Sequence, residues 1–155
     1  MKRTLLSVGV ALALGAGYCM SAFAQAKPEV LVKQRQAAMT LIGKYWQPLG
    51  GMAQGKVPYN AEMVKRNAGY LAVLDKMPWD GFSPETKGTS VKTAALPAIW
   101  NEPDKFKQAQ ERLQSEVSKL VQVSASGDEA AVKAQLGATG KACGGCHENF
   151  REKQQ

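Results

Sequence analysis

Histidine and cysteine are scarce in this chain of 155 residues, which contains one histidine, His147, and three cysteines. Three thiols are too few for the disulfide framework of small secreted domains. A structural zinc site needs about four ligands. Because Cys19 lies in a segment that we expect to be removed, a zinc site is not expected either.

Regular alternation of polar and apolar residues is also missing, so the sequence predicts no β-strand. The basic residues are scattered, without a block of like charge or an interleaved set of aromatic side chains, and nucleic-acid binding is therefore not expected. Hydrophobic residues at 45% and charged residues at 21% are typical of an ordinary globular protein. A chain of this length can form one domain with a sizeable core.

The N-terminus carries an apolar run that is too short to span a bilayer comfortably. Two basic residues precede this run from Leu5 to Ala16, and the small-residue motif Ala22-Phe23-Ala24 follows it. These are the three parts of a secretory signal peptide with its cleavage site. We therefore predict a cleaved signal peptide at residues 1–24, a mature domain at residues 25–155 and export to the bacterial periplasm.

A lipid anchor on Cys19 is the weaker interpretation, because bulky Tyr18 stands where lipoprotein signals have a small residue. We therefore expect no membrane anchor. The mature chain keeps an excess of basic residues, which would weakly attract an acidic redox partner, although the sequence does not identify that partner.

The most specific motif is Cys143-Gly144-Gly145-Cys146-His147, close to the C-terminus. Cys-x-x-Cys-His is the attachment signature of a c-type haem. The two cysteines form thioethers with the macrocycle, and the adjacent imidazole binds the iron. On a helix, Cys143 and His147 lie four residues apart and therefore on one face. We predict one covalently attached haem c per chain, with Cys143 and Cys146 as its tethers and His147 as axial iron ligand.

Two other interpretations of the cysteine pair are weaker. A thioredoxin-like redox pair expects alternating strands and helices around it, and no strand pattern is present. A plain disulfide would leave the adjacent histidine unexplained.

Helical periodicity occurs in four stretches of the mature chain. The first runs from about Pro28 to Leu49 and is ended by Gly50-Gly51. The second begins near Asn60 and stops at Pro78. The third begins after Asn101 or Pro103, and the fourth follows Asp128. Only the connection between the second and third stretches is long. The pattern predicts an all-α fold, an antiparallel up-down-up-down four-helix bundle with the haem in its core. The inner face of the second helix is expected to carry Met63, Asn67, Tyr70, Leu71, Leu74 and Met77.

The side of the iron away from His147 must be filled from elsewhere in the chain. With a single histidine, coordination by two histidines of one chain is excluded. Met39 lies one turn after Arg35 on the same face of the first helix. An inward arginine needs an anionic partner, and a haem propionate would supply one through charge-assisted hydrogen bonds. Alternatively, Arg35 reaches out to solvent and Met39 merely packs.

Three segments together resemble the cytochrome c prime family, the class II c-type cytochromes. They are Arg35-Gln36-Ala37-Ala38-Met39, the loop from Pro78-Trp79 and Phe82 to Leu96-Pro97-Ala98-Ile99-Trp100, and the haem motif followed by Phe150-Arg151. The resemblance implies a four-helix bundle that pairs as a homodimer through its first two helices. It also implies five-coordinate, high-spin iron that binds nitric oxide or carbon monoxide beneath a packed apolar distal side.

The resemblance also implies roles for individual residues. Arg35 is expected to meet a propionate, and Arg151 to lie beside the proximal imidazole. Independently of the resemblance, Gln36 is a further candidate for a haem contact. Phe82 is expected to pack with Met39 on the distal face. The alternative is a low-spin electron carrier in which His147 and Met39 both ligate the iron. We expect no enzymatic activity, since a peroxidase needs a distal acid-base group and the chain has no second histidine.

Overall fold

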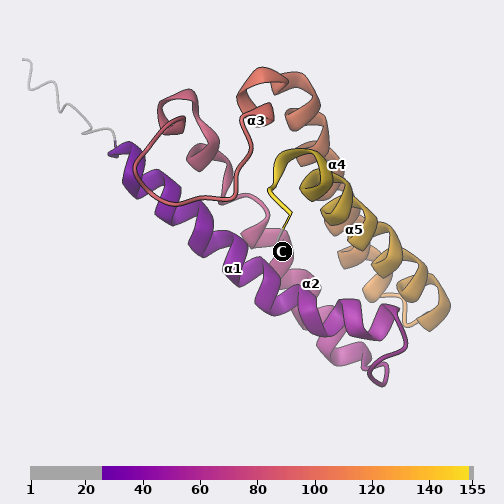
Figure 1. Cartoon of the computed structure of the whole chain (residues 1–155). Coiled ribbons are helices and arrows are strands. Elements are labelled where there is room, and N and C mark those ends of the chain that lie inside the picture. Colours follow the sequence, from indigo (N-terminus) through magenta and orange to yellow (C-terminus); the bar gives the residue numbers. More distant parts are fainter. Residues whose placement is uncertain (1–25, 154–155) are drawn as a thin grey trace, which may run out of the picture.

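The computed structural model describes residues 26–153, which form an antiparallel up-down-up-down bundle of four long helices, as predicted (Figure 1). These helices are α1 (Pro28–Ala53), α2 (Ala61–Leu74), α4 (Pro103–Ser124) and α5 (Glu129–Phe150). The predicted signal peptide lies outside the described residues. Among residues 26–153, no helix combines the length and the apolar character needed to cross a membrane.

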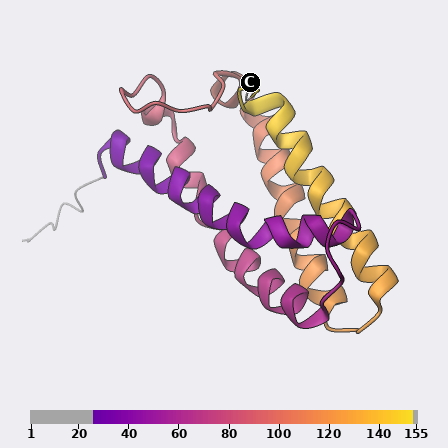
Figure 2. The same cartoon turned by 60° about the horizontal axis from the view of Figure 1, so that its bottom comes forward.

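The helices form two pairs, α1 with α2 and α4 with α5, that meet at one end of the molecule and diverge at the other (Figures 1 and 2). The α1–α2 and α4–α5 connections lie at the end where the pairs meet. The long connection between α2 and α4 bridges the open end, and it contains two 3-10 helices, η1 (Trp79–Phe82) and η2 (Pro84–Thr86), and the short α3 (Ala98–Asn101). Phe82 and Thr93 of this bridging connection line the cavity described below.

Side-chain caps fix the starts of two helices where the sequence predicts them. The Asn60 side chain accepts a hydrogen bond from the Met63 amide at 2.8 Å. Asp128 accepts bonds from the amides of Ala130 and Ala131 at 2.9 and 3.1 Å. Each cap satisfies amides that have no partner inside their own helix.

The predicted end of α1 is wrong, because the helix continues through Gly50-Gly51 to Ala53. The extra turn buries Met52, which is 3% exposed, next to the fully buried Leu49. Burying such a side chain contributes about 1.5–3 kcal/mol, which offsets the roughly 2 kcal/mol that two glycines cost inside a helix, at about 1 kcal/mol each. The chain turns only at Gly55, whose φ of 67° suits glycine.

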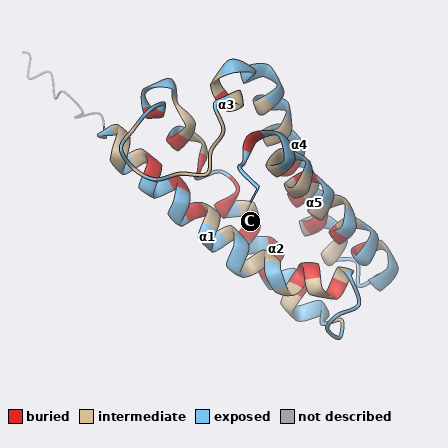
Figure 3. Cartoon of the chain, viewed as in Figure 1, coloured by how far each residue is buried: buried red, intermediate tan, exposed pale blue. Residues whose placement is uncertain are grey.

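The hydrophobic core lies between the four long helices, on their facing sides (Figure 3). Its largest fully buried apolar side chains are Leu49, Val64, Leu120, Val132 and Leu136. Trp46 packs beside them against α5 at Gly140, where a Cβ atom would lie 3.2 Å from the indole ring. Glycine at this position therefore lets the indole ring approach the α5 backbone.

The prediction for the inner face of α2 is partly wrong. Asn67, Leu71 and Leu74 are buried as expected, but Tyr70 is 46% exposed and Met77 is 54% exposed. α2 ends at Leu74, so Met77 lies beyond the helix. Tyr70 instead contacts Tyr45 of α1, with ring centroids 4.8 Å apart. The buried face of α2 is therefore shifted relative to the predicted one, towards Val64 and Ala68, which are both 0% exposed.

Asp75, the C-cap residue that follows α2, carries a buried carboxyl group, and the residue is 2% exposed. Its backbone carbonyl accepts hydrogen bonds from Trp79 Nε1 at 2.6 Å and Gln114 Nε2 at 3.2 Å, which anchor η1 and α4 to this point. Neither carboxylate oxygen has a hydrogen-bond partner among the described residues, although Lys76 Nζ lies 3.4 Å from Oδ1. Burial therefore raises the pKa of Asp75, and Lys76 offsets only part of this effect.

We predict that D75N removes a destabilising charge. A raised folded-state pKa means that the unfolded chain loses its Asp75 proton first as the pH rises above about 4, the ordinary aspartate value. The wild type should therefore lose stability relative to D75N as the pH rises above about 4, and the two should converge in acid. Denaturant titrations of the haem-loaded chains at several pH values measure this difference. D80N, at an exposed aspartate of η1, is the matched control; equal pH dependence of all three proteins would contradict the prediction.

Candidate haem site

A cavity of about 450 Å³ lies between α1, α5 and the bridging connection. All eight residues that the sequence predicts for the site line this cavity: Arg35, Gln36, Met39, Phe82, Cys143, Cys146, His147 and Arg151. They come from three segments that are far apart in the sequence, and folding brings them to one place.

The attachment motif occupies the last turns of α5. Cys143 and Cys146 are free thiols, each partly buried, and His147 lines the same cavity. Burial and the neighbouring Cys146 raise the pKa of Cys143 to about 11, and burial also raises the pKa of Cys146. Burial, and then the positive charge of Arg151, lowers the pKa of His147. The imidazole is therefore held in its neutral form, which is the form that ligates metals.

Arg35 is a buried cation without an anionic partner among the described residues. It is 2% exposed, so the interpretation in which it reaches solvent is wrong. Its guanidinium donates to the Gly81 carbonyl, to Thr93 Oγ1 at 2.9 Å and to Thr86 Oγ1 at 3.4 Å, which are all neutral acceptors. Burial lowers the pKa of Arg35, but an arginine stays charged in proteins.

The unpaired charge of Arg35 tests whether the site fits a haem. A buried charge is costly unless it is paired, and Arg35 lines the cavity. An anionic group placed in the cavity would supply the missing partner, and the propionates of haem are such groups. The residues present therefore fit the cofactor.

Aromatic side chains form one wall of the cavity. The Phe82 ring centroid lies 5.0 Å from that of Phe106, which lies 5.2 Å from that of Phe150. Trp79 and Met39 extend the apolar lining. Among the described residues that line the cavity there is no carboxylate, so nothing beside Phe82 and Met39 could serve as a carboxylic acid or base.

The bridging connection is fastened to both neighbouring helices. Gln36 Nε2 of α1 donates to the Lys92 carbonyl at 2.8 Å. At the end of α5, the Leu96 amide donates to the Phe150 carbonyl at 3.0 Å, and the Glu152 amide donates to the Ala94 carbonyl at 2.8 Å. The amide group of Gln36, predicted to contact the haem, thus holds the connection in place at the edge of the cavity.

Sequence reasoning missed several lining residues, of which Trp46, Thr93 and Phe106 are the clearest. Trp46 carried a usable signal, because it lies two turns after Met39 on α1 and therefore on nearly the same face. The sequence gives no signal that Thr93 and Phe106 line the cavity, because their positions depend on how the long connection between α2 and α4 folds back.

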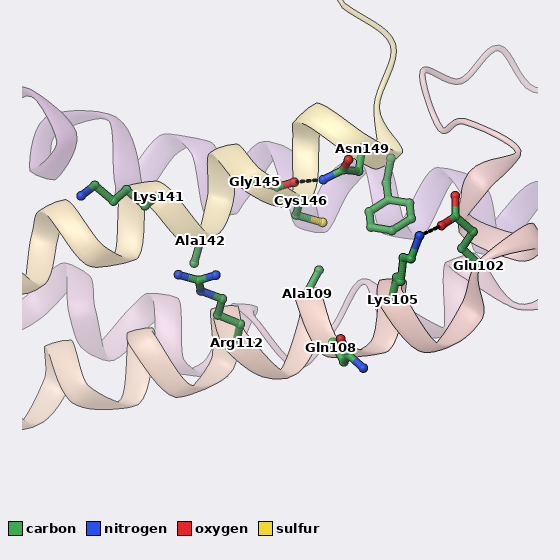
Figure 4. A pocket seen from close by; sticks show the side chains of 11 residues that line it. Glu102, Lys105, Gln108, Ala109, Arg112, Lys141, Ala142, Gly145, Cys146 and Asn149 are labelled. Atoms are coloured by element: carbon green, nitrogen blue, oxygen red, sulfur yellow. Dashed lines mark hydrogen bonds and ion pairs between the residues drawn. The ribbon is translucent and has the colours of Figure 1, made fainter.

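A second groove, of about 500 Å³, lies between α4 and α5 (Figure 4). Three basic side chains line it, Lys105, Arg112 and Lys141, with Glu102 as the one acidic side chain. Glu102 is already paired with Lys105. Cys146 lines both the groove and the haem cavity, so the two spaces meet at a predicted attachment residue.

Fold and site together define a four-helix-bundle cytochrome of the c type. A family model described as Cytochrome C' matches residues 30–151. A cytochrome c' from Rubrivivax gelatinosus is 40% identical over 82% of this chain and 98% of its own length. The chain belongs to the cytochrome c' family, and its cofactor is a covalently bound haem c.

Solved structures agree with this assignment. The crystal structure of cytochrome c' from Rubrivivax gelatinosus superposes with a TM-score of 0.76 at 38% identity, covering 81% of this chain and 98% of that one. The nitric oxide complex of a variant of cytochrome c prime from Alcaligenes xylosoxidans has a TM-score of 0.73 at 36% identity, covering 83% of this chain and 98% of that one.

Proposed function

We propose that this chain is a periplasmic haem protein whose five-coordinate, high-spin iron binds small diatomic gases such as nitric oxide and carbon monoxide. One observation carries the proposal: the cavity is lined on one side by His147 and the attachment cysteines, and on another by apolar side chains without an acid or base. The nitric oxide complex of the Alcaligenes xylosoxidans relative supports it. Export rests on the predicted signal peptide at residues 1–24.

Each residue of the site has a distinct task in this proposal. Cys143 and Cys146 would tether the cofactor to α5, and His147 would bind its iron. The haem supplies, when bound, an iron that accepts a small ligand on the side away from His147. Arg35 would neutralise a propionate and gain the anionic partner that it lacks.

The apolar side chains would decide which ligands enter. Met39 and Phe82 offer no hydrogen-bond donor, so they would stabilise neither bound peroxide nor a charged ligand. Their bulk would leave room only for small molecules. Because no distal acid-base group is present among the described lining residues, we keep the prediction that the chain has no enzymatic activity.

The competing possibility is that Met39 bonds the iron, which would give a low-spin electron carrier. A thioether ligand raises the reduction potential. Met39 is only partly buried and lines the cavity, so its sulfur is free to turn towards a bound group. The two possibilities differ in what fills the sixth coordination position.

Optical spectra of the reduced protein, with and without carbon monoxide, test the proposal. We expect a high-spin spectrum that changes when carbon monoxide is added, because no side chain occupies the ligand position. M39L should leave the spin state unchanged. A low-spin reduced spectrum that carbon monoxide does not change, and that M39L converts to high spin, would instead establish His147/Met39 ligation.

We also propose that two copies pair through α1 and α2. Tyr70 and Val73 of α2 and Leu41 of α1 are large hydrophobic side chains that are 46%, 58% and 42% exposed. Tyr70 contacts Tyr45, which lies one turn after Leu41, so these side chains form one stripe across both helices. An exposed apolar stripe of this kind is typical of an interaction surface.

V73E should separate the two copies, since it places a charge in the middle of this stripe. Light scattering after size-exclusion chromatography should give the mass of one chain for V73E and of two chains for the wild type. The control is V57E, at a valine that is 42% exposed in the connection between α1 and α2. If V73E keeps the mass of two chains, the contact lies elsewhere.

The basic groove between α4 and α5 favours electron exchange as an additional function. Arg112 and Lys141 have no ion pair within 4 Å among the described residues. Both line the same groove as Cys146, although the Lys141 side chain points away from Cys146 (Figure 4). An acidic redox partner would be attracted to this surface, where the haem tether comes closest to it. The partner itself is unknown.

The double variant R112E/K141E tests this route. Oxidation of the reduced protein by hexacyanoferrate(III), a trianion, should become several-fold slower at low salt, and oxidation by the cationic cobalt(III) tris-phenanthroline complex should become faster. Both differences should shrink at high ionic strength. The control K33E/K65E makes the same change of net charge at exposed lysines of α1 and α2; if it has an equal effect, the groove is not the route.

A further inference from the structure

Gly81 of η1 lies closer to α1 than any other residue type would permit. A Cβ atom at this position would stand 2.5 Å from Arg35 Cβ and 2.7 Å from the Leu31 carbonyl oxygen. Real Cβ contacts are essentially never shorter than 3.0 Å, and the Leu31 oxygen belongs to the backbone of α1, which cannot rotate away. Gly81 is not among the glycines with positive φ, so the requirement for glycine comes from space and not from backbone conformation.

The contact at Gly81 holds the next residue, Phe82, in the wall of the haem cavity. Arg35 donates a hydrogen bond to the Gly81 carbonyl, and its guanidinium carbon lies 4.7 Å from the centroid of the Phe82 ring. Trp100 Nε1 donates to the Phe82 carbonyl at 2.9 Å. The backbone on both sides of the Phe82 ring is therefore fixed, one side to α1 and the other to α3.

We propose that Gly81 is a positioning residue that sets how far Phe82 enters the haem cavity, and thereby the size of ligand that the distal side admits. The inference rests on the proposed gas-binding function. Phe82 lines the cavity, and only the missing side chain at Gly81 allows η1 to sit against α1. A methyl group here must push η1 outwards, and Phe82 moves with it.

Arg35 makes the same contact sensitive to the cofactor. One guanidinium group holds the Gly81 carbonyl, packs against Phe82 and borders the cavity that a propionate would share. The position of η1 is therefore linked, through Arg35, to the haem propionate that would pair with it. Gly81 touches neither the ligand nor the iron in this proposal; it acts through Phe82.

The variant G81A tests the proposal in the haem-loaded protein. The rate of carbon monoxide association after flash photolysis should rise several-fold, because the withdrawn ring leaves the distal side more open. F82A is the reference variant and should raise the rate in the same direction. G69A is the matched control, since Gly69 is an exposed helical residue of α2 with no atom within 4 Å of an added Cβ; it should leave the rate unchanged.

A second measurement does not depend on ligand binding. Amide hydrogen exchange of residues 79–87 in the haem-loaded chain, without carbon monoxide, should be faster in G81A than in the wild type and G69A. If G81A does not fold, W100F, which removes the donor to the Phe82 carbonyl without adding an atom at α1, should give faster carbon monoxide association.

The outcomes separate this inference from the proposed function. If F82A accelerates carbon monoxide binding but G81A matches the wild type, Gly81 does not position Phe82 and the inference is overturned. Faster exchange in G81A with an unchanged association rate would overturn it as well, since the role would be structural only. If neither the wild type nor any variant binds carbon monoxide, the proposed function fails. Hydrogen exchange then tests the Gly81 contact by itself, and equal exchange rates in G81A and the wild type would show that this contact does not hold η1.

Discussion

The buried guanidinium of Arg35 is the interaction on which the open end of the bundle depends. Gly81, Thr86 and Thr93 belong to three parts of the bridging connection, and all three hydrogen-bond to this one side chain. Without it, the connection would lose its main attachment to α1, leaving Gln36 and the contacts with the end of α5. A buried cation is costly unless its charge is compensated, so an anionic group in the cavity would stabilise this end of the fold.

The cavity has two chemically different regions, one polar and charged and one apolar. Charge and hydrogen-bond donors gather where Arg35 and Thr93 lie, whereas Phe82, Phe106 and Phe150 form an apolar wall. The first region suits the propionate edge of a haem, and the second suits an uncharged ligand. This separation is produced by η1, which places the Arg35 contact and the Phe82 ring next to each other.

The sequence predicted the class of fold and the principal site residues because those signals are local. The haem motif, the caps at Asn60 and Asp128, and the helical spacing of Arg35 and Met39 can all be read within a few residues. The errors arose where packing overrides local preference: burial of Met52 carries α1 past Gly50-Gly51, and Tyr70 pairs with Tyr45 at the surface. The basic groove and the Gly81 contact could not be predicted from the sequence, because each joins residues that only the folded chain brings together.

The position of α1 decides what Met39 can do, and that position is set two turns further along the helix. Trp46 lies against Gly140 of α5, where an added Cβ would stand 3.2 Å from the ring, and a Cβ on Gly50 would stand 3.3 Å from its indole nitrogen. The indole ring therefore acts as a spacer between α1 and α5 whose thickness cannot be reduced. Arg35 ties α1 to the bridging connection on the other side of Met39, so α1 is anchored on both sides of Met39. A rigid spacing of this kind favours a packing role for Met39 over a bond to iron.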